Sequence, residues 1–148
     1  MKNAAVLEDV KVHVKFKLAA LWASVMFLYI YGDYFGLYQP GVLQHLLQGR
    51  IPAFGAVTQA ILLAFSAMMA VPSVMVFLSL ALPTQANRWV NFFTGALYTL
   101  IVAATLPGAW MFTIFLGAVE IALTLSIAWD AWRWPLAEQS AHRAAGQG

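Results

Sequence analysis

The chain contains no cysteine and very few charged residues. Of its 148 residues, 62% are hydrophobic and only 9% are charged, whereas roughly 25% of the residues in an ordinary soluble domain are charged. The absence of cysteine excludes disulfides, thiol nucleophiles and thiolate metal sites. So few charges could not cover a soluble surface, so the composition predicts a protein whose surface faces lipid. The length suits a single membrane domain without a separate soluble catalytic domain.

The side chains that common catalytic centres need are missing from the apolar segments. The three histidines, His13, His45 and His142, are scattered over both flanks and the first loop, so they predict neither a metal site nor haem ligation. The serines have no histidine nearby to act as a base, and no glycine-rich phosphate loop is present. We therefore expect no cofactor and no metal, and a non-enzymatic protein is favoured over an enzyme.

Four long apolar segments lie at about residues 16–37, 57–82, 89–107 and 109–132. Each is long enough to cross a hydrocarbon core of roughly 30 Å as a helix, and the alternating pattern of a β-barrel is absent. Turn-forming residues at 38–41, 83–87 and 107–108 separate them. Residues 42–49 have a short amphipathic pattern typical of an interfacial helix, and residues 138–148 are expected to form a flexible tail. The sequence predicts an all-α membrane four-helix bundle with a short interfacial helix in its first outer loop.

Basic residues gather on one side of this four-span arrangement. Only Arg50 lies on the opposite side from the others, which are Lys2, Lys11, Lys15, Lys17, Arg88, Arg133 and Arg143. The positive-inside rule then places both termini in the cytoplasm. Because the formal net charge is only +2 and the cations lie near segment ends, they indicate topology rather than a nucleic-acid surface. Membrane lipids, and other copies of the chain in a homo-oligomer, are the partners to expect.

Glu120 lies near the centre of the last apolar segment, where an acid costs roughly 2.5–3.5 kcal/mol on insertion scales. Helical spacing places it on one face with Thr113, Gly117 and Thr124. Each other segment has a polar or small-residue stripe of its own, so we expect these faces to line the interior of the bundle. The stripes are Ser24 and Tyr31 in the first segment, Gln59, Ser66 and Ser73 in the second, and Asn91, Gly95, Tyr98 and Thr105 in the third.

The segments contain no lysine or arginine except Lys17 at the start of the first one, so Glu120 has no predicted cationic partner at its depth and low dielectric favours its protonated form. Central placement of the segments puts Ser66, Met69, Tyr98 and Thr99 near its depth. The neutral acid could donate a hydrogen bond to the carbonyl of Met68, which Pro72 leaves without its helical donor. Structural hydrogen bonding, proton or cation coupling, and ligand recognition all stay open for Glu120.

Asp33 is the second acid of interest. It lies about 22 Å along the first helix from Leu18, close to the outer interface. An aromatic rim surrounds it, formed by Tyr29, Tyr31, Tyr34 and Tyr38. It is either an interfacial anchor or the mouth of a pocket shared with Arg50 and Gln59. Its depth differs from that of Glu120 by roughly 8–10 Å, so a direct acid pair is not expected, whereas a water-linked relay stays open. The candidate binding residues are Glu120, Tyr98, Thr124, Ser66, Asp33, Gln59 and Arg50.

At the end of the last segment, Asp130 and Arg133 are three residues apart and predict a surface ion pair along the helix.

Several runs of residues carry a resemblance to a known family. They include Leu-Glu-Asp-Val-Lys-Val at 7–12, Met-Phe-Leu-Tyr-Ile-Tyr-Gly-Asp-Tyr-Phe at 26–35, Asn-Arg-Trp-Val-Asn at 87–91 and Val-Glu-Ile at 119–121. Together they resemble a family of small bacterial four-span membrane proteins catalogued as a domain of unknown function. The resemblance extends to about Pro135 and implies four spans in a bacterial inner membrane, but it assigns no catalytic residue. In size and span number the chain is also loosely similar to DoxX-like membrane proteins.

Three functions are compatible with these features. The favoured one is a structural or accessory membrane component, in which polar stripes hold the bundle or an oligomer together. The second is a small proton- or cation-coupled transporter or channel subunit that uses Glu120. The third is a lipid- or quinone-binding membrane protein with a pocket near Asp33.

Overall fold

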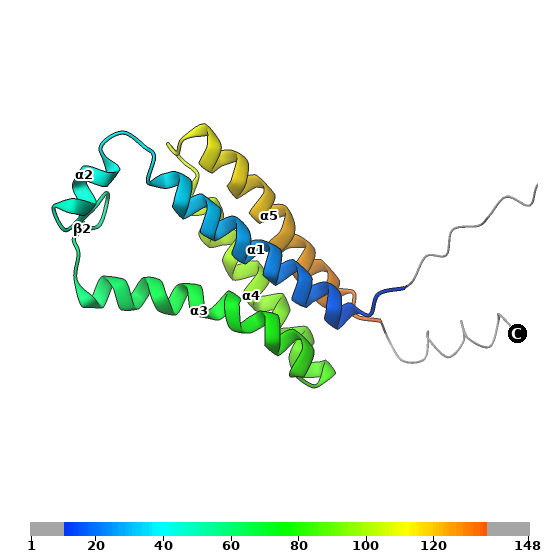
Figure 1. Ribbon diagram of the computed structural model, residues 1–148. Coiled ribbons are helices and arrows are strands. Elements are labelled where there is room, and N and C mark those ends of the chain that lie inside the picture. The colour runs from blue at the N-terminus through cyan, green and yellow to red at the C-terminus, as the bar shows by residue number, and fades with distance from the viewer. Residues whose placement is uncertain (1–10, 136–148) are drawn as a thin grey trace, which may run out of the picture.

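The computed structural model describes residues 11–135, so the tail expected at 138–148 lies outside the described residues. The described chain is mostly helical (Figure 1). Its elements in order are α1 (Val14–Gly36), α2 (Val42–Leu47), β1 (Arg50–Ile51), β2 (Gly55–Ala56), α3 (Gln59–Ala81), α4 (Thr84–Thr105) and α5 (Met111–Trp132). The four long helices correspond to the four apolar segments, with shifted boundaries.

The four long helices pack side by side in one bundle (Figure 1). Helix α1 packs against α3 and α5, and α4 packs along α5, as the short turn at residues 107–108 predicts. Helix α3 meets α4 much less, and the two ribbons diverge away from their connecting turn. We call the end with α2, the β-ribbon and the α4–α5 turn the loop end. The end with the start of α1, the α3–α4 turn and the end of α5 is the terminal end.

By length and composition, α1, α3 and α5 could each cross a membrane. Helix α4 is as long but less apolar, because its first turns carry Asn87, Arg88 and Asn91. It also begins at Thr84 rather than at residue 89, so the connection expected at 83–87 is already helical. In its first turn, the Asn87 side chain donates a hydrogen bond of 2.6 Å to the carbonyl of Ser79 and thereby caps the preceding helix.

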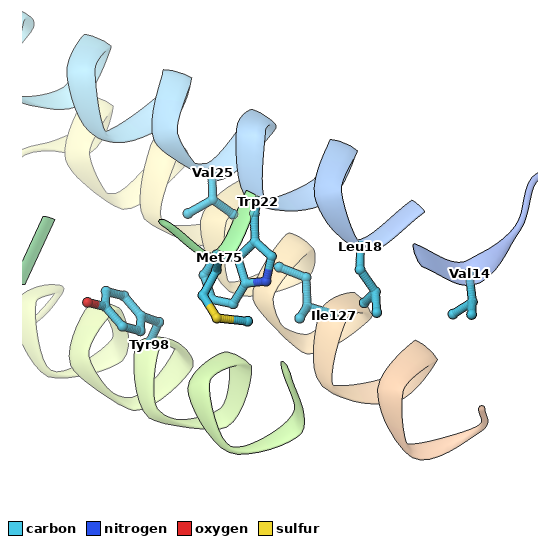
Figure 2. Close-up of a cluster of buried hydrophobic side chains, with 7 residues drawn as sticks. All are labelled: Val14, Leu18, Trp22, Val25, Met75, Tyr98 and Ile127. Atoms are coloured by element: carbon cyan, nitrogen blue, oxygen red, sulfur yellow. The ribbon is translucent and has the colours of Figure 1, made fainter. Parts of the chain in front are cut away.

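The best-packed region lies toward the terminal end. Trp22 points from α1 into the space between α4 and α5, next to Met75 of α3 and Ile127 of α5 (Figure 2). Trp22 and Ile127 are completely buried. Tyr98 closes the cluster on its other side, with its ring edge-on to Trp22 at 6.0 Å. This cluster joins all four long helices.

A buried hydrogen-bond network accompanies the apolar cluster. Asn91 is its centre, because its side-chain oxygen accepts from the Trp22 indole at 2.7 Å and from the Ser79 hydroxyl at 3.1 Å. Its side-chain nitrogen donates to the side-chain oxygen of Asn87 at 2.6 Å. Asn91, Ser79 and Asn87 have no exposed surface. Every polar group of this network therefore has a partner, as burial in a bundle requires.

The predicted inward polar faces are correct for two helices and wrong for two. On α4 and α5 the stripes contain the buried Asn91, Gly95, Tyr98, Gly117, Glu120 and Thr124. On α1 and α3 the stripe residues Ser24, Tyr31, Gln59, Ser66 and Ser73 are all exposed. Their serine hydroxyls donate to the carbonyls of their own helix four residues earlier, so a partner helix is not needed.

The loop end is covered by short elements. The helix expected at 42–49 is present as α2, and an antiparallel β-ribbon pairs Arg50 with Ala56, a feature that the sequence did not indicate. Phe54 at the tip of the ribbon packs edge-on against Phe65 of α3 at 5.1 Å. The ribbon is thereby held close to α3.

Candidate binding cavity

A cavity of about 450 Å³ lies inside the loop end of the bundle. All four long helices line it, and Val42 and Leu46 of α2 together with Ile51 and Pro52 form part of its wall. Helix α3 contributes only Met68 and Met69, because its first part diverges from the other long helices (Figure 1). The walls are mostly apolar, as is usual for small-molecule sites.

Glu120 of α5 is the most buried acid that lines this cavity. Its side chain is 7% exposed, and within residues 11–135 no hydrogen-bond donor lies in range of its carboxyl group. One turn further along α5, the buried Thr124 hydroxyl bonds to the Glu120 carbonyl at 2.9 Å and to Thr99 of α4 at 2.8 Å. The helix is therefore firmly held at this position while the carboxyl group is left free.

Tyr29 of α1 lies level with Glu120. Phe35 contacts Phe112 at 6.5 Å, which sets the relative height of α1 and α5. Counted from that contact at 1.5 Å per residue, Tyr29 and Glu120 lie within about 3 Å of the same depth. The Tyr29 hydroxyl is buried and has no hydrogen-bond partner among the described residues. The Tyr29 hydroxyl and the Glu120 carboxyl group, neither of which has a hydrogen-bond partner among the described residues, thus line the same cavity at a similar depth.

Asp33 lines the same cavity nearer its outer end. By the same count it lies about 9 Å closer to the loop end than Glu120, as the sequence predicts. The two carboxyl groups line one cavity but form no direct hydrogen bond. Asp33 is exposed whereas Glu120 is buried. Asp33 therefore lies in the open part of the cavity and Glu120 in its closed part.

Tyr98 corrects one expectation for Glu120. Pro72 lacks the N–H that would bond the Met68 carbonyl, so this carbonyl needs another donor. The sequence suggests Glu120 for that role, but the donor is the Tyr98 hydroxyl. Tyr98 is 3% exposed and reaches from α4 across to α3. Because the tyrosine takes the carbonyl, the Glu120 carboxyl has no partner there.

Of the seven predicted site residues, the cavity brings together Asp33, Tyr98 and Glu120. Thr124 lies buried beside them but bonds to other helix groups. The remaining three, Ser66, Gln59 and Arg50, are exposed and do not line the cavity. Tyr29 also lines the cavity but was not among the predicted site residues, because the sequence placed it in the outer aromatic rim. The available signal was its spacing, four residues before Asp33 on one helix face.

The cavity is chemically one-sided. Two carboxyl groups and two tyrosine hydroxyls face it, and no lysine, arginine or histidine is among its lining residues. Within residues 11–135, no three histidine, aspartate or glutamate side chains gather as metal ligands would. The arrangement can accept hydrogen bonds and stabilise positive charge, but it offers no nucleophile with a base beside it.

The chain matches a family model over most of its length. Neither the curated proteins nor the solved structures contain a match to the chain. The looser similarity to DoxX-like proteins therefore gains no support. Residues 7–141 match a family described as "Family of unknown function (DUF6326)", which confirms the resemblance to an uncharacterised family. Because the match covers most of the 148 residues, the chain belongs to the family of unknown function DUF6326.

Proposed function

We propose that this protein is a four-span protein of the bacterial inner membrane that binds a small organic cation with an apolar body. The ligand would occupy the cavity between the four long helices. The observation that carries the proposal is Glu120, a residue only 7% exposed that lines the cavity and whose carboxyl group has no hydrogen-bond partner among the described residues. A buried acid without a partner is unfavourable, so a fold that retains one has a use for it.

Four spans are supported by the packing of α4. Helix α4 packs along α5, and only a few residues connect the two helices. A membrane that α5 crosses is therefore also crossed by α4. Helix α4 also exposes large apolar side chains as the other long helices do, among them Phe93, Leu97 and Leu100. Among the described cations, five lie at the terminal end and Arg50 alone at the loop end, which supports cytoplasmic termini.

A cationic ligand is supported by the charges and rings that face the cavity. Glu120 and Asp33 bring two acids, and no basic side chain lines the wall to neutralise them. The Tyr29 and Tyr98 rings lie with their centroids 6.4 Å apart, and aromatic faces attract ammonium groups. The apolar remainder of the wall suits the carbon body of the ligand.

Proton exchange is a second function that this geometry favours. Glu120 lies in the closed part of the cavity and Asp33 in its open part, so water in between could link them. A neutral Glu120 would release its proton when a cation binds. The same site would then serve the cation-coupled transporter that the sequence left open.

The test is a comparison of two ligands that differ only in charge. Benzyltrimethylammonium and its neutral isostere neopentylbenzene would be titrated by calorimetry into the protein in nanodiscs, with empty nanodiscs as the control for partition into lipid. We expect binding of the cation only. The trimethylammonium group has no N–H, so charge alone attracts it to the carboxylate. Two unit charges 4 Å apart attract by about 4 kcal/mol at an effective dielectric of 20, and desolvation offsets part of this, so Glu120→Gln should weaken binding by about tenfold or more.

Asp33→Asn should weaken binding less, because Asp33 is exposed to solvent. Release of a proton on binding, seen as a dependence of the measured heat on the ionisation enthalpy of the buffer, should disappear in Glu120→Gln. Equal binding of the two ligands, or an unchanged affinity in Glu120→Gln, would refute the proposal.

A further inference from the structure

A second hollow, of about 1030 Å³, lies at the terminal end of the bundle, away from the acidic cavity. It is a groove between α1 and α5 that also touches Phe92 of α4. Lys17 to Ser24 forms one wall and Leu125 to Trp132 the other, and each wall runs for about 10 Å along its helix. Because α1 and α5 run in opposite directions, Lys17 and Trp132 lie at the end of the groove nearest the termini, which we call its mouth, and Ser24 and Leu125 lie at its inner end, toward the middle of the bundle.

The inner end of the groove, toward the middle of the bundle, is effectively apolar. Its two hydroxyls do not face a ligand, because Ser24 donates to the Ala20 carbonyl at 3.0 Å and Ser126 to the Ala122 carbonyl at 2.7 Å. The rest of the wall here is alanine and leucine. Such a slot accepts a hydrocarbon chain.

The mouth of the groove carries one charge of each sign. Lys17 is exposed and Asp130 is half-buried, and both line the groove. Within residues 11–135 neither forms an ion pair or a side-chain hydrogen bond. The pair predicted between Asp130 and Arg133 is not formed, because the Arg133 guanidinium instead stacks on the Trp129 ring at 4.4 Å.

The other cations nearby are engaged with the protein itself. Lys15 donates to the carbonyls of Leu80 and Leu82 at the end of α3. Arg88 donates to the Trp132 carbonyl at the end of α5. These bonds satisfy helix ends that otherwise lack partners. Lys17 and Asp130 are therefore the two charged residues at this mouth that do not bond to a helix end.

We propose that this groove binds a phospholipid whose headgroup carries a phosphate and a primary ammonium, as ethanolamine lipids do. Lys17 would contact the phosphate and Asp130 the ammonium, while an acyl chain fills the apolar slot. Trp129 and Trp132 flank the mouth, where indole rings favour the membrane interface. A purely anionic headgroup would meet repulsion from Asp130, and a choline headgroup would offer it no N–H to donate.

Native mass spectrometry of the full-length protein tests this site. The detergent-solubilised protein would be mixed with equal amounts of phosphatidylethanolamine, phosphatidylglycerol and phosphatidylcholine that share the same acyl chains. We expect the ethanolamine lipid to be retained most. A surface charge contact is worth about 1 kcal/mol, so Lys17→Gln should reduce its binding by about fivefold. Asp130→Asn should abolish the preference for ethanolamine over glycerol.

The matched control is Lys11→Gln, which removes an exposed cation at the same end but outside the groove. It should leave the lipid ratios unchanged. Each variant's near-UV circular dichroism would verify that the tryptophans keep their native environment. Equal retention of the three lipids, a preference for phosphatidylglycerol in the unmodified protein, or a preference that survives Asp130→Asn would overturn the proposal.

Discussion

At the scale of single residues, Glu120 and Tyr98 show how one hydrogen bond decides the character of a site. The Met68 carbonyl that Pro72 leaves free accepts from Tyr98, not from the acid. Glu120 is consequently buried at a cavity wall without a bond to hold it. A residue in that situation weakens the empty protein, because burial of an acid is unfavourable. Under the proposed function, a cation that enters the cavity offsets this cost.

Replacement of Glu120 by methionine should therefore stabilise the empty protein, by about 1–2 kcal/mol, because the cost of placing an acid in the bundle is removed. The measurement is reversible unfolding of both proteins in the same detergent. Glu120→Gln should also be neutral or stabilising. Clear destabilisation by both substitutions would instead support a structural, hydrogen-bonding role for the acid, as in an accessory membrane protein.

At the scale of elements, the pairing of α4 and α5 depends on close approach at Gly95. A Cβ atom at this position would lie 3.0 Å from the Thr124 carbonyl oxygen and 3.2 Å from the Ala128 backbone nitrogen. Backbone atoms cannot move aside as a flexible side chain can. The bond between Thr99 and Thr124 is formed one turn away along α4, so it needs the same close approach. This contact between the helices also positions the backbone of Glu120.

Gly95→Ala should destabilise the protein by about 1–3 kcal/mol, as overpacking of a tight contact usually does. Gly36→Ala is the matched control, because it lies at the end of α1 with no atom within 4 Å of the added carbon. Thermal unfolding of the two variants in detergent provides the comparison. Equal melting temperatures would show that α4 and α5 do not pack as closely as described.

At the scale of the whole molecule, the interior of the bundle is packed at the terminal end and hollow at the loop end, while the groove between α1 and α5 lies on its outer surface. Trp22 and the asparagine network close the terminal end, whereas the divergence of α3 leaves space at the loop end. This division matches the proposed orientation, because the closed end would face the cytoplasm and the hollow end the outside. Tests of the orientation and of the site are therefore linked.

The absence of cysteine provides a clean background for labelling. Leu47 is 81% exposed at the loop end, and Gln85 is exposed at the terminal end. In spheroplasts, a membrane-impermeant maleimide should label Leu47→Cys, whereas Gln85→Cys should be labelled only after lysis. The measurement is the mass shift of the purified protein. Labelling of both positions from the outside would contradict a bundle that crosses the membrane with its two ends on opposite sides.

Much of the fold and part of the site follow from the sequence because they depend on local patterns. The long helices, the antiparallel hairpin of α4 and α5, and the inward faces of those two helices all follow from apolar length, turn residues and helical spacing. The faces of α1 and α3 do not. A serine can satisfy its hydroxyl within its own helix, so its spacing does not reveal which way the helix faces.

The sequence by itself determined that this protein has long apolar helices and carries one acid deep in the last of them. Only the tertiary structure decided what that acid meets. The Tyr98 hydroxyl donates to the Met68 carbonyl that the sequence offered to Glu120, and the Glu120 side chain lines a cavity where α3 diverges from the other helices. Both effects depend on contacts between helices distant in the chain, and such contacts leave no local pattern. The placement of Tyr29 at the depth of Glu120 likewise depends on the packing of α1 against α5.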